Sequence, residues 1–224
     1  MALSFLDLVF PKRCVSCRRL GNYICTDCFL KIEFLEHPVC PVCQRQAIGG
    51  RVHPGCKTLY TLDGLVVACK YRGPVRNAIK KVKYRWVRSI EKVLVDLLVS
   101  QIWRFDLPED VILVPVPLHI KRERWRGFNQ SEILASTLGR EFKVQSNLSI
   151  NRLIDTKAQV RLDRKARKEN VKGAFAIARG AKVEGTNIIL VDDVYTSGST
   201  MSECAKVLKK AGAKSVLGAA IALG

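Results

Sequence analysis

Two adjacent acidic residues, Asp192 and Asp193, follow an apolar run at 187–191 and precede a loop of small hydroxyl residues around one glycine. Paired carboxylates are good partners for vicinal hydroxyl groups. A hydroxyl-rich loop that enters a helix can direct backbone N–H groups and the helix dipole at a phosphate. The pattern therefore predicts a site for a phosphorylated ribose. Its candidate residues are Asp192, Asp193, Tyr195, Thr196, Ser197, Gly198, Ser199 and Thr200.

The alternative is that the two acids merely end a strand and residues 196–200 form an ordinary N-cap turn. The ligands of open parallel sheets bind at the carboxyl ends of the strands, which is where these acids are expected to lie. That position favours a binding site.

The cysteines carry a second kind of chemistry, because seven of the nine lie before residue 57, six of them in three Cys-x-x-Cys pairs and the seventh in His53-x-x-Cys56. Each Cys-x-x-Cys pair can present two thiolates to one tetrahedral Zn²⁺. Two structural zinc sites are expected, although the pairs could also be interleaved. The first would use Cys14, Cys17, Cys25 and Cys28, and the second Cys40, Cys43, His53 and Cys56. Cys69 and Cys204 are expected to be packed thiols.

The net charge of +18 is concentrated in two segments. Residues 70–92 contain nine Lys or Arg against Glu91 alone, and residues 152–172 contain eight against three acids. Such an excess favours a polyanionic ligand, and the interleaved Tyr71, Tyr84 and Trp86 suit stacking on single-stranded nucleic acid. In the other interpretation the aromatic rings are core residues and the cations are solvated. The candidate nucleic-acid contacts are Lys70, Arg72, Arg76, Lys80, Lys81, Lys83 and Arg85.

These groups must be positioned by elements whose pattern changes near residue 61. The segment 1–60 has little apolar periodicity and is expected to be a small zinc-binding domain. Residues 61–224 are expected to form an α/β domain with an open, mainly parallel sheet. Strands are predicted at 65–69, 111–116, 175–177, 187–191 and 215–221, and helices at 87–103, 130–142 and 201–210.

No apolar run reaches the roughly 18 residues needed to cross a bilayer, and the first ten residues lack the form of a secretory signal. Cysteines in this arrangement are typical of a compartment that keeps thiols reduced. We therefore expect a cytoplasmic protein without membrane insertion.

The segment 190–200 resembles the signature of type I phosphoribosyltransferases, which bind 5-phosphoribosyl 1-diphosphate with Mg²⁺. Ser197 replaces the second threonine of the usual Thr-Thr-Gly-x-Thr and keeps the hydroxyl. The resemblance implies that Asp192 and Asp193 hold the ribose, and also act in catalysis if the domain is an enzyme.

Upstream segments extend the resemblance over nearly the whole chain. Together with the cysteine pairs, they resemble the ComF family of late-competence proteins, which join a zinc-binding region to a phosphoribosyltransferase-like domain. These segments are Val114-Pro115-Val116-Pro117-Leu118, Arg124-x-Arg126-Gly127-Phe128-Asn129-Gln130, Thr156-x-x-Gln159, Arg167-x-x-Asn170 and Gly173-Ala174-Phe175.

The family resemblance also implies a diphosphate subsite, in which residues 161–167 would lie on a flexible loop that closes over the ligand. Its residues would be Pro117, Leu118, His119, Arg126, Arg161 and Arg167. His119 could equally be an ordinary surface histidine.

Three functions follow from these predictions. The ComF resemblance implies DNA uptake, with single-stranded DNA and a helicase-like ATPase as partners. The site could instead transfer the phosphoribosyl group to an acceptor that the sequence does not identify. It could also bind the sugar diphosphate as a signal without converting it.

Overall fold

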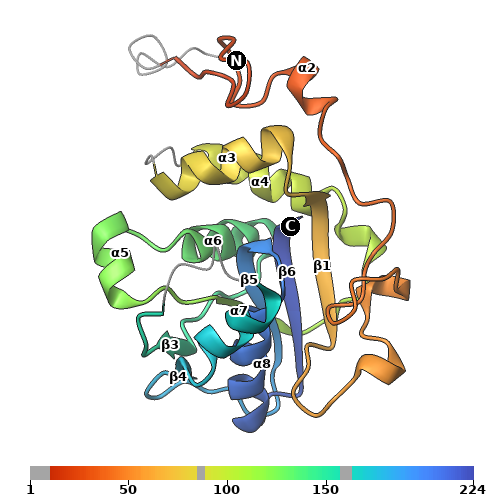
Figure 1. Cartoon of the computed structure of the whole chain (residues 1–224), viewed down its shortest axis with the longest axis vertical. Helices are drawn as coiled ribbons and strands as arrows, with labels where there is room; N and C mark the ends of the chain where they lie inside the picture. The colour runs from red at the N-terminus through yellow and green to blue at the C-terminus, as the bar shows by residue number, and fades with distance from the viewer. Residues whose placement is uncertain (1–10, 85–88, 157–162) are drawn as a thin grey trace.

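The computed structural model describes residues 11–84, 89–156 and 163–224. Its main sheet contains four parallel strands in the order β1-β6-β5-β2. All four were expected from the sequence, and the fold class is confirmed as an open, mainly parallel α/β sheet with an N-terminal cysteine-rich module (Figure 1). The strands are β1 (Gly64–Lys70), β2 (Val111–Pro115), β5 (Asn187–Tyr195) and β6 (Ser215–Leu223).

Helices cover both faces of this sheet, which explains why its strands are apolar along most of their length. Ile189 and Val191 of β5 pack on one face with three helices, whereas Ile188 and Leu190 pack on the other face with α8. The first face carries α3 (Gly73–Tyr84), α4 (Ser89–Val99) and α6 (Gln130–Phe142), and the second carries α8 (Ser199–Lys210).

A second, antiparallel sheet pairs β3 (Ile150–Arg152) with β4 (Phe175–Ile177). The sequence predicts β4 but not β3, because β4 reads Phe-Ala-Ile and is apolar throughout, whereas β3 reads Ile-Asn-Arg and has one apolar residue. Between these strands lies α7 (Arg164–Val171), and α5 (Ile120–Arg126) follows β2. Both helices are short and mostly polar, so they lack the apolar periodicity by which helices are predicted.

Two predicted boundaries differ from the structure by more than two residues. The helix expected at 87–103 ends at Val99 and is followed by the 3-10 turn η3 (Ile102–Arg104); residues 85–88 lie outside the described part of the chain. The strand expected to stop at Val191 continues to Tyr195, so both acids belong to β5.

The N-terminal segment runs along the β1 edge of the sheet (Figure 1). The amide of Lys70 donates to the carbonyl of Glu33 at 2.8 Å, and the amide of Leu35 donates to that of Ala68 at 2.9 Å. These bonds cover an edge that would otherwise expose unpaired backbone groups. The short elements of this segment are α2 (Thr26–Phe29), η1 (Ile48–Gly50) and η2 (Pro54–Cys56).

Within the described residues, every helix is too short or too polar to serve as a membrane span.

Candidate functional site

The acidic pair lies at the carboxyl end of β5, where helices from the same face reach it. Asp192 Oδ1 accepts hydrogen bonds from Ser131 Oγ of α6 at 2.9 Å and from the Asp193 backbone amide at 2.8 Å. Asp193 is buried, and its Oδ2 lies 2.8 Å from Lys83 Nζ of α3. The pair is therefore held by two helices that the sequence does not connect with it.

Burial and the neighbouring charge of Asp193 raise the pKa of Asp192 to about 6. Lys83 and the hydrogen bonds from Asp193 and Ser131 oppose this rise. Besides Lys83, the Arg152 guanidinium interacts electrostatically with Asp192. A carboxylate whose pKa is raised by burial and by a neighbouring acid is typical of a functional site.

The loop after the acids has the geometry expected of a phosphate cradle. Gly198 adopts a left-handed conformation with φ 74°, and Ser199 begins α8. A Cβ atom on Gly198 would overlap the Tyr195 side chain, so this position requires glycine. The hydroxyl oxygens of Ser197 and Ser199 lie 2.9 Å apart at the start of the helix. The backbone and hydroxyl donors thus converge where the helix dipole favours an anion.

The segment 117–119 lies at the same edge, because β2 pairs with β5 in parallel and the Val116 amide donates to the Val191 carbonyl at 2.9 Å. His119 is 9% exposed and caps the start of α5, with its Nδ1 3.8 Å from an Asp155 carboxylate oxygen. It is therefore a largely buried histidine rather than a surface one.

The two described arginines that the resemblance assigns to the diphosphate lie on different helices. Arg126 ends α5, and its Nη1 lies 2.5 Å from Gln130 Oε1. Arg167 belongs to α7 rather than to an open loop, because Asp163 caps that helix through the Ala166 amide. Arg161 lies outside the described residues. Residues from Arg164 onward are therefore helical, and the expectation that the segment 161–167 closes over the ligand stays a prediction.

The basic run at 70–92 divides into groups with different surroundings. Lys70 and Arg72 both lie near Glu33, at 3.2 Å and 3.9 Å. Arg76 and Lys80 are exposed on α3. Lys83 points at Asp193 instead of solvent, so we reassign it from the nucleic-acid contacts to the acidic pair.

Three other predicted contacts in this run provide less information. Lys81 is half-buried, Tyr71 packs against the core, and Arg85 lies outside the described residues.

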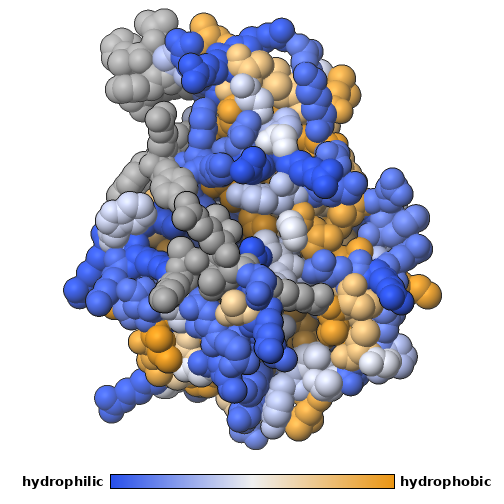
Figure 2. All heavy atoms as spheres, in the orientation of Figure 1, coloured by the Kyte–Doolittle hydropathy of each residue, from blue (hydrophilic) through white to orange (hydrophobic). Residues whose placement is uncertain are grey.

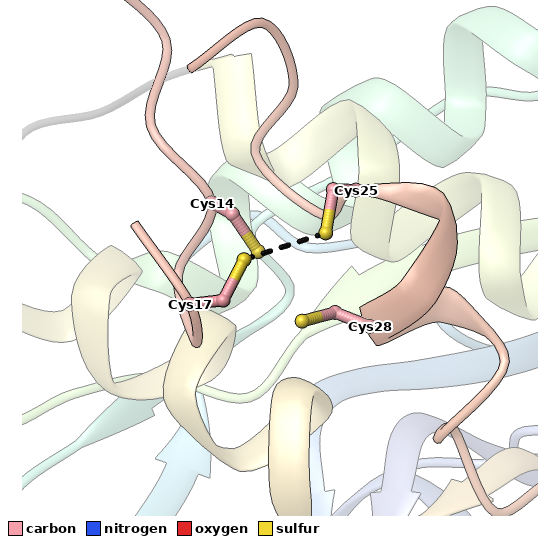
Figure 3. Close-up of side chains that lie close together, drawn as sticks. All are labelled: Cys14, Cys17, Cys25 and Cys28. Atoms are coloured by element: carbon pink, nitrogen blue, oxygen red, sulfur yellow. Dashed lines mark hydrogen bonds between the residues drawn. The ribbon is translucent and has the colours of Figure 1, made fainter. Parts of the chain in front are cut away.

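The first cysteine set forms one compact cluster (Figure 3). The sulfur atoms of Cys14, Cys17, Cys25 and Cys28 all lie within 4.8 Å of one another. The cluster therefore has the donor set and spacing of a closed zinc site.

The second set is equally compact and is not interleaved with the first. Ligand atoms of Cys40, Cys43, His53 and Cys56 lie within 4.8 Å of one another. His53 Nε2 lies 2.9 Å from the Gln46 carbonyl, so it must carry the proton that it donates there. This bond leaves the lone pair of Nδ1, 3.3 Å from Cys43 Sγ, available to a metal.

The thiols within each set have divergent acidity. Burial would raise the pKa of Cys14, but backbone N–H groups around it prevail and lower the value to about 6. Cys40 shows the same balance, at about 7. Burial and the neighbouring thiols raise the pKa of Cys28 to about 12 and that of Cys56 to about 11. A bound cation such as Zn²⁺ would favour the thiolate forms of Cys28 and Cys56.

Three residues near the site were missed by the sequence analysis or given another role. They are Lys83, Ser131 and Gln44, whose side-chain amide donates to the Thr196 carbonyl at 2.6 Å. Each acts across a distance in sequence that no local motif spans.

Comparisons with known proteins agree with this two-part organisation. A model of the double zinc ribbon domain matches residues 5–57, and a model of the phosphoribosyl transferase domain matches residues 129–223. Competence protein F of Haemophilus influenzae is 30% identical over 92% of this chain and 95% of its own length. DNA utilization protein YhgH of Escherichia coli is 30% identical over 93% of this chain and 96% of its own.

A third relative, competence protein ComFC of Bacillus subtilis, is 27% identical over 84% of this chain and 79% of its own length. Together with the phosphoribosyltransferase fold and two zinc clusters, these matches show that the chain belongs to the family of competence protein F and ComFC.

Proposed function

We propose that the chain binds 5-phosphoribosyl 1-diphosphate together with Mg²⁺ at the carboxyl edge of β5. One observation carries the proposal: the paired acids of β5 continue directly into a glycine-containing hydroxyl loop at the start of α8. Such a loop suits the 5-phosphate, and the acids suit the ribose hydroxyls.

The segment 117–119 supplies the place for the diphosphate, because it leaves the neighbouring strand at the same edge. Of the three arginines assigned to the diphosphate, Arg126 lies nearest to that segment in sequence. A bound Mg²⁺ would neutralise diphosphate charge, and the carboxylate oxygens of the acidic pair are the hard ligands that this ion accepts. Lys83 holds Asp193 in place and balances part of its charge.

Calorimetric titration with 5-phosphoribosyl 1-diphosphate, with and without Mg²⁺, tests the site. We expect Mg²⁺-dependent binding that weakens at least tenfold in Asp192→Ala and in Asp193→Ala. Asp106→Ala removes an exposed carboxylate that pairs with Arg51 and serves as the matched control. Absence of binding by the unchanged chain, or equal binding by all three variants, would contradict the proposal.

Binding does not by itself imply transfer. In an enzyme, the acids would hold the ribose while the anomeric carbon acquires positive charge, and Arg126 would stabilise the departing diphosphate. In a sensor, the same contacts would bind the ligand unchanged. Product analysis after a long incubation with a mixture of candidate acceptors separates the two. In an enzyme the bond from C1 to diphosphate breaks as a bond from C1 to the acceptor or to water forms, and free diphosphate appears, whereas a sensor leaves the ligand intact.

A role in DNA uptake, with single-stranded DNA as a ligand, is the second function we propose. Two relatives are named competence proteins, and a third is named a DNA utilization protein. Arg72, Arg76 and Lys80 are exposed and spaced four residues apart around the start and along one side of α3, which suits contacts to phosphates. The helicase-like ATPase implied by the family resemblance stays a prediction.

Helix α5 carries an exposed aromatic side chain that can stack on a base. Trp125 is 74% exposed and lines a hollow of about 410 Å³ with Lys121, Arg122, Asp155 and Thr156. Figure 2 shows hydrophilic side chains gathered over α5. An exposed indole beside cations can stack on a base while the cations contact the backbone.

Fluorescence anisotropy with a labelled oligonucleotide, measured at several salt concentrations, tests the nucleic-acid proposal. We expect Trp125→Ala to weaken binding about fivefold or more. Trp103→Ala removes an equally exposed indole, whose neighbour Arg104 donates to the carbonyls of Leu35 and Glu36, and should leave binding unchanged. Equal effects of the two variants would exclude a stacking role for α5.

Replacing Arg72, Arg76 and Lys80 together by Gln should lower the slope of log affinity against log salt by about two, since each lost phosphate contact on a single strand removes about 0.7. An unchanged slope would exclude this stripe from the binding surface.

A further inference from the structure

The second cysteine set contacts the proposed phosphate loop directly. Tyr195 Oη donates to the Pro41 carbonyl at 2.6 Å, and Gln44 Nε2 donates to the Thr196 carbonyl at 2.6 Å. These bonds join residues more than 150 positions apart in sequence. Both partners on the N-terminal side belong to the turn Cys40-Pro41-Val42-Cys43-Gln44.

Tyr195 transmits this contact to the backbone of the loop. Its side chain is 2% exposed and lies directly against Gly198, where no Cβ atom would fit. The loop thus turns over the tyrosine ring, and the hydroxyl of that ring is fixed by the carbonyl of Pro41. A displacement of Pro41 would therefore move the support of the loop.

The turn itself is shaped around the metal ligands. The backbone amide of Gln44 donates to the Cys40 carbonyl at 2.9 Å, and the backbone amide of Cys40 donates to the Arg45 carbonyl at 2.9 Å. Gln44 has a left-handed backbone with φ 58°, which is unfavourable for a residue with a side chain. A metal held by Cys40 and Cys43 stabilises this conformation, because both ligands lie within the turn.

The first cysteine set contains the same turn in another place. Arg18 follows Cys17 as Gln44 follows Cys43, with φ 65° and an amide that donates to the Cys14 carbonyl at 3.0 Å. Its neighbour Ser16 contacts Asn77 of α3 rather than the loop. The chain therefore provides an internal control for the second set.

We propose that the second zinc site positions the phosphate loop, with Gln44 and the Pro41 carbonyl as the positioning groups. Zinc at Cys40, Cys43, His53 and Cys56 and the sugar diphosphate at residues 196–200 then bind with positive coupling. Because coupling is reciprocal, the ligand also holds zinc more tightly at this site and not at the first. The inference rests on the proposed function for the identity of the ligand only.

Hydrogen exchange of the loop tests the positioning without any ligand. In the full chain with both zinc ions bound, we expect Gln44→Ala to speed exchange of the amides at 196–200. The loss of one neutral hydrogen bond should also weaken binding of the sugar diphosphate about fivefold. Gln44→Glu should have a larger effect, because its carboxylate repels the Thr196 carbonyl. Tyr195→Phe should resemble Gln44→Ala.

Arg18→Ala is the matched control, since it replaces a long side chain by alanine at the same left-handed position of the other turn. It should change neither the exchange nor the affinity. Zinc content and the unfolding midpoint establish that each variant keeps both ions and its fold. If Gln44→Ala and Gln44→Glu both match Arg18→Ala in exchange and affinity, the proposal is wrong.

Zinc release to a chelating dye tests the reciprocal effect. We expect 5-phosphoribosyl 1-diphosphate with Mg²⁺ to slow one of two release phases, and the slowed phase to be the one abolished in Cys43→Ser. Slowing of both phases, or of the phase abolished in Cys17→Ser, would overturn the coupling. If the unchanged chain binds no sugar diphosphate while Gln44→Ala still loosens the loop, the ligand assignment fails and the positioning role stands.

Discussion

Two lysines of the basic run on α3 have different surroundings. Lys80 is exposed, whereas Lys83, one turn further along α3, lies 2.8 Å from the carboxylate of Asp193. In the sequence the two residues look equivalent, because both are lysines of the same basic run. The phase of the helix separates them, since positions three residues apart differ by about 60° around the axis.

Lys83→Met should raise the pKa of Asp192 above its value of about 6, because Lys83 is the cation that opposes the rise. We expect a change of about one unit, measured by carboxyl carbon resonances during a pH titration. Lys80→Met, which removes an exposed cation from the same helix, is the control and should cause no shift. A midpoint equal in both variants would remove Lys83 from the site.

The same variant should change how stability depends on pH. Because the folded pKa of Asp192 is raised, its contribution to stability is complete below the ordinary value of 3.8 and is lost as the pH rises through about 6. Without Lys83 this loss extends to higher pH. Urea unfolding should therefore show a larger destabilisation of Lys83→Met at pH 7 than at pH 5.

Gly198→Ala should be more harmful than the same change at another glycine with positive φ. Gly180 has φ 79° with no atom near its would-be Cβ, so Gly180→Ala should cost about 1 kcal/mol from backbone strain alone. At Gly198 the overlap with Tyr195 adds to that strain, for a total of about 3 kcal/mol. The free energy of unfolding in urea measures both, and equal costs would contradict the close packing.

At the scale of elements, each helix that approaches the acids must start at a fixed place. Asn129 is 2% exposed and caps α6 by accepting from the Ser131 amide at 3.0 Å. Its side-chain amide donates to the Val116 carbonyl at 3.2 Å. One residue thus fixes the start of α6 against the end of β2, and the Ser131 hydroxyl is thereby directed at Asp192.

Asn129→Ala should lower the free energy of unfolding by about 2 kcal/mol, because it removes the cap and leaves a buried carbonyl without its donor. Asn129→Ser keeps a capping oxygen and should cost less. Affinity for the sugar diphosphate should fall in the same order. If serine and alanine are equally destabilising, the cap is not what holds the helix.

Some elements could be predicted from the sequence pattern and others could not. The four strands of the main sheet were predictable because burial on both faces makes them continuously apolar. The helices α5 and α7 were not, because their sequences IKRERWR and RKARKENV contain no apolar stripe. Tertiary contacts and caps stabilise them instead.

At the scale of the whole molecule, the zinc module is both a domain and a support. It covers the β1 edge through residues 33–35. Through Pro41 and Gln44 it also contacts Tyr195 and Thr196 beside the acidic pair. The expected boundary near residue 60 stays a prediction, although the zinc ribbon match ends at 57 and β1 begins at Gly64.

Zinc content should reveal two separate sites rather than an interleaved pair. Cys14→Ser with Cys28→Ser should remove one zinc ion per chain, because both residues belong to one cluster. Cys14→Ser with Cys56→Ser should remove both. Interleaved sites that paired the first and third Cys-x-x-Cys units would give loss of both ions in each case, so elemental analysis by mass spectrometry separates the arrangements.

Residues whose chemistry depends on close spacing could be identified before the fold was known: the acids and hydroxyls of 192–200, and the cysteine pairs. Short spacing imposes proximity through the covalent chain, whatever the fold. The fold was needed to establish which cysteine pairs lie together, that Lys83 contacts Asp193, and that Gln44 contacts the loop. Those contacts join residues up to about 150 positions apart, so they exist only once strand order, helix phase and the docking of the zinc module are fixed.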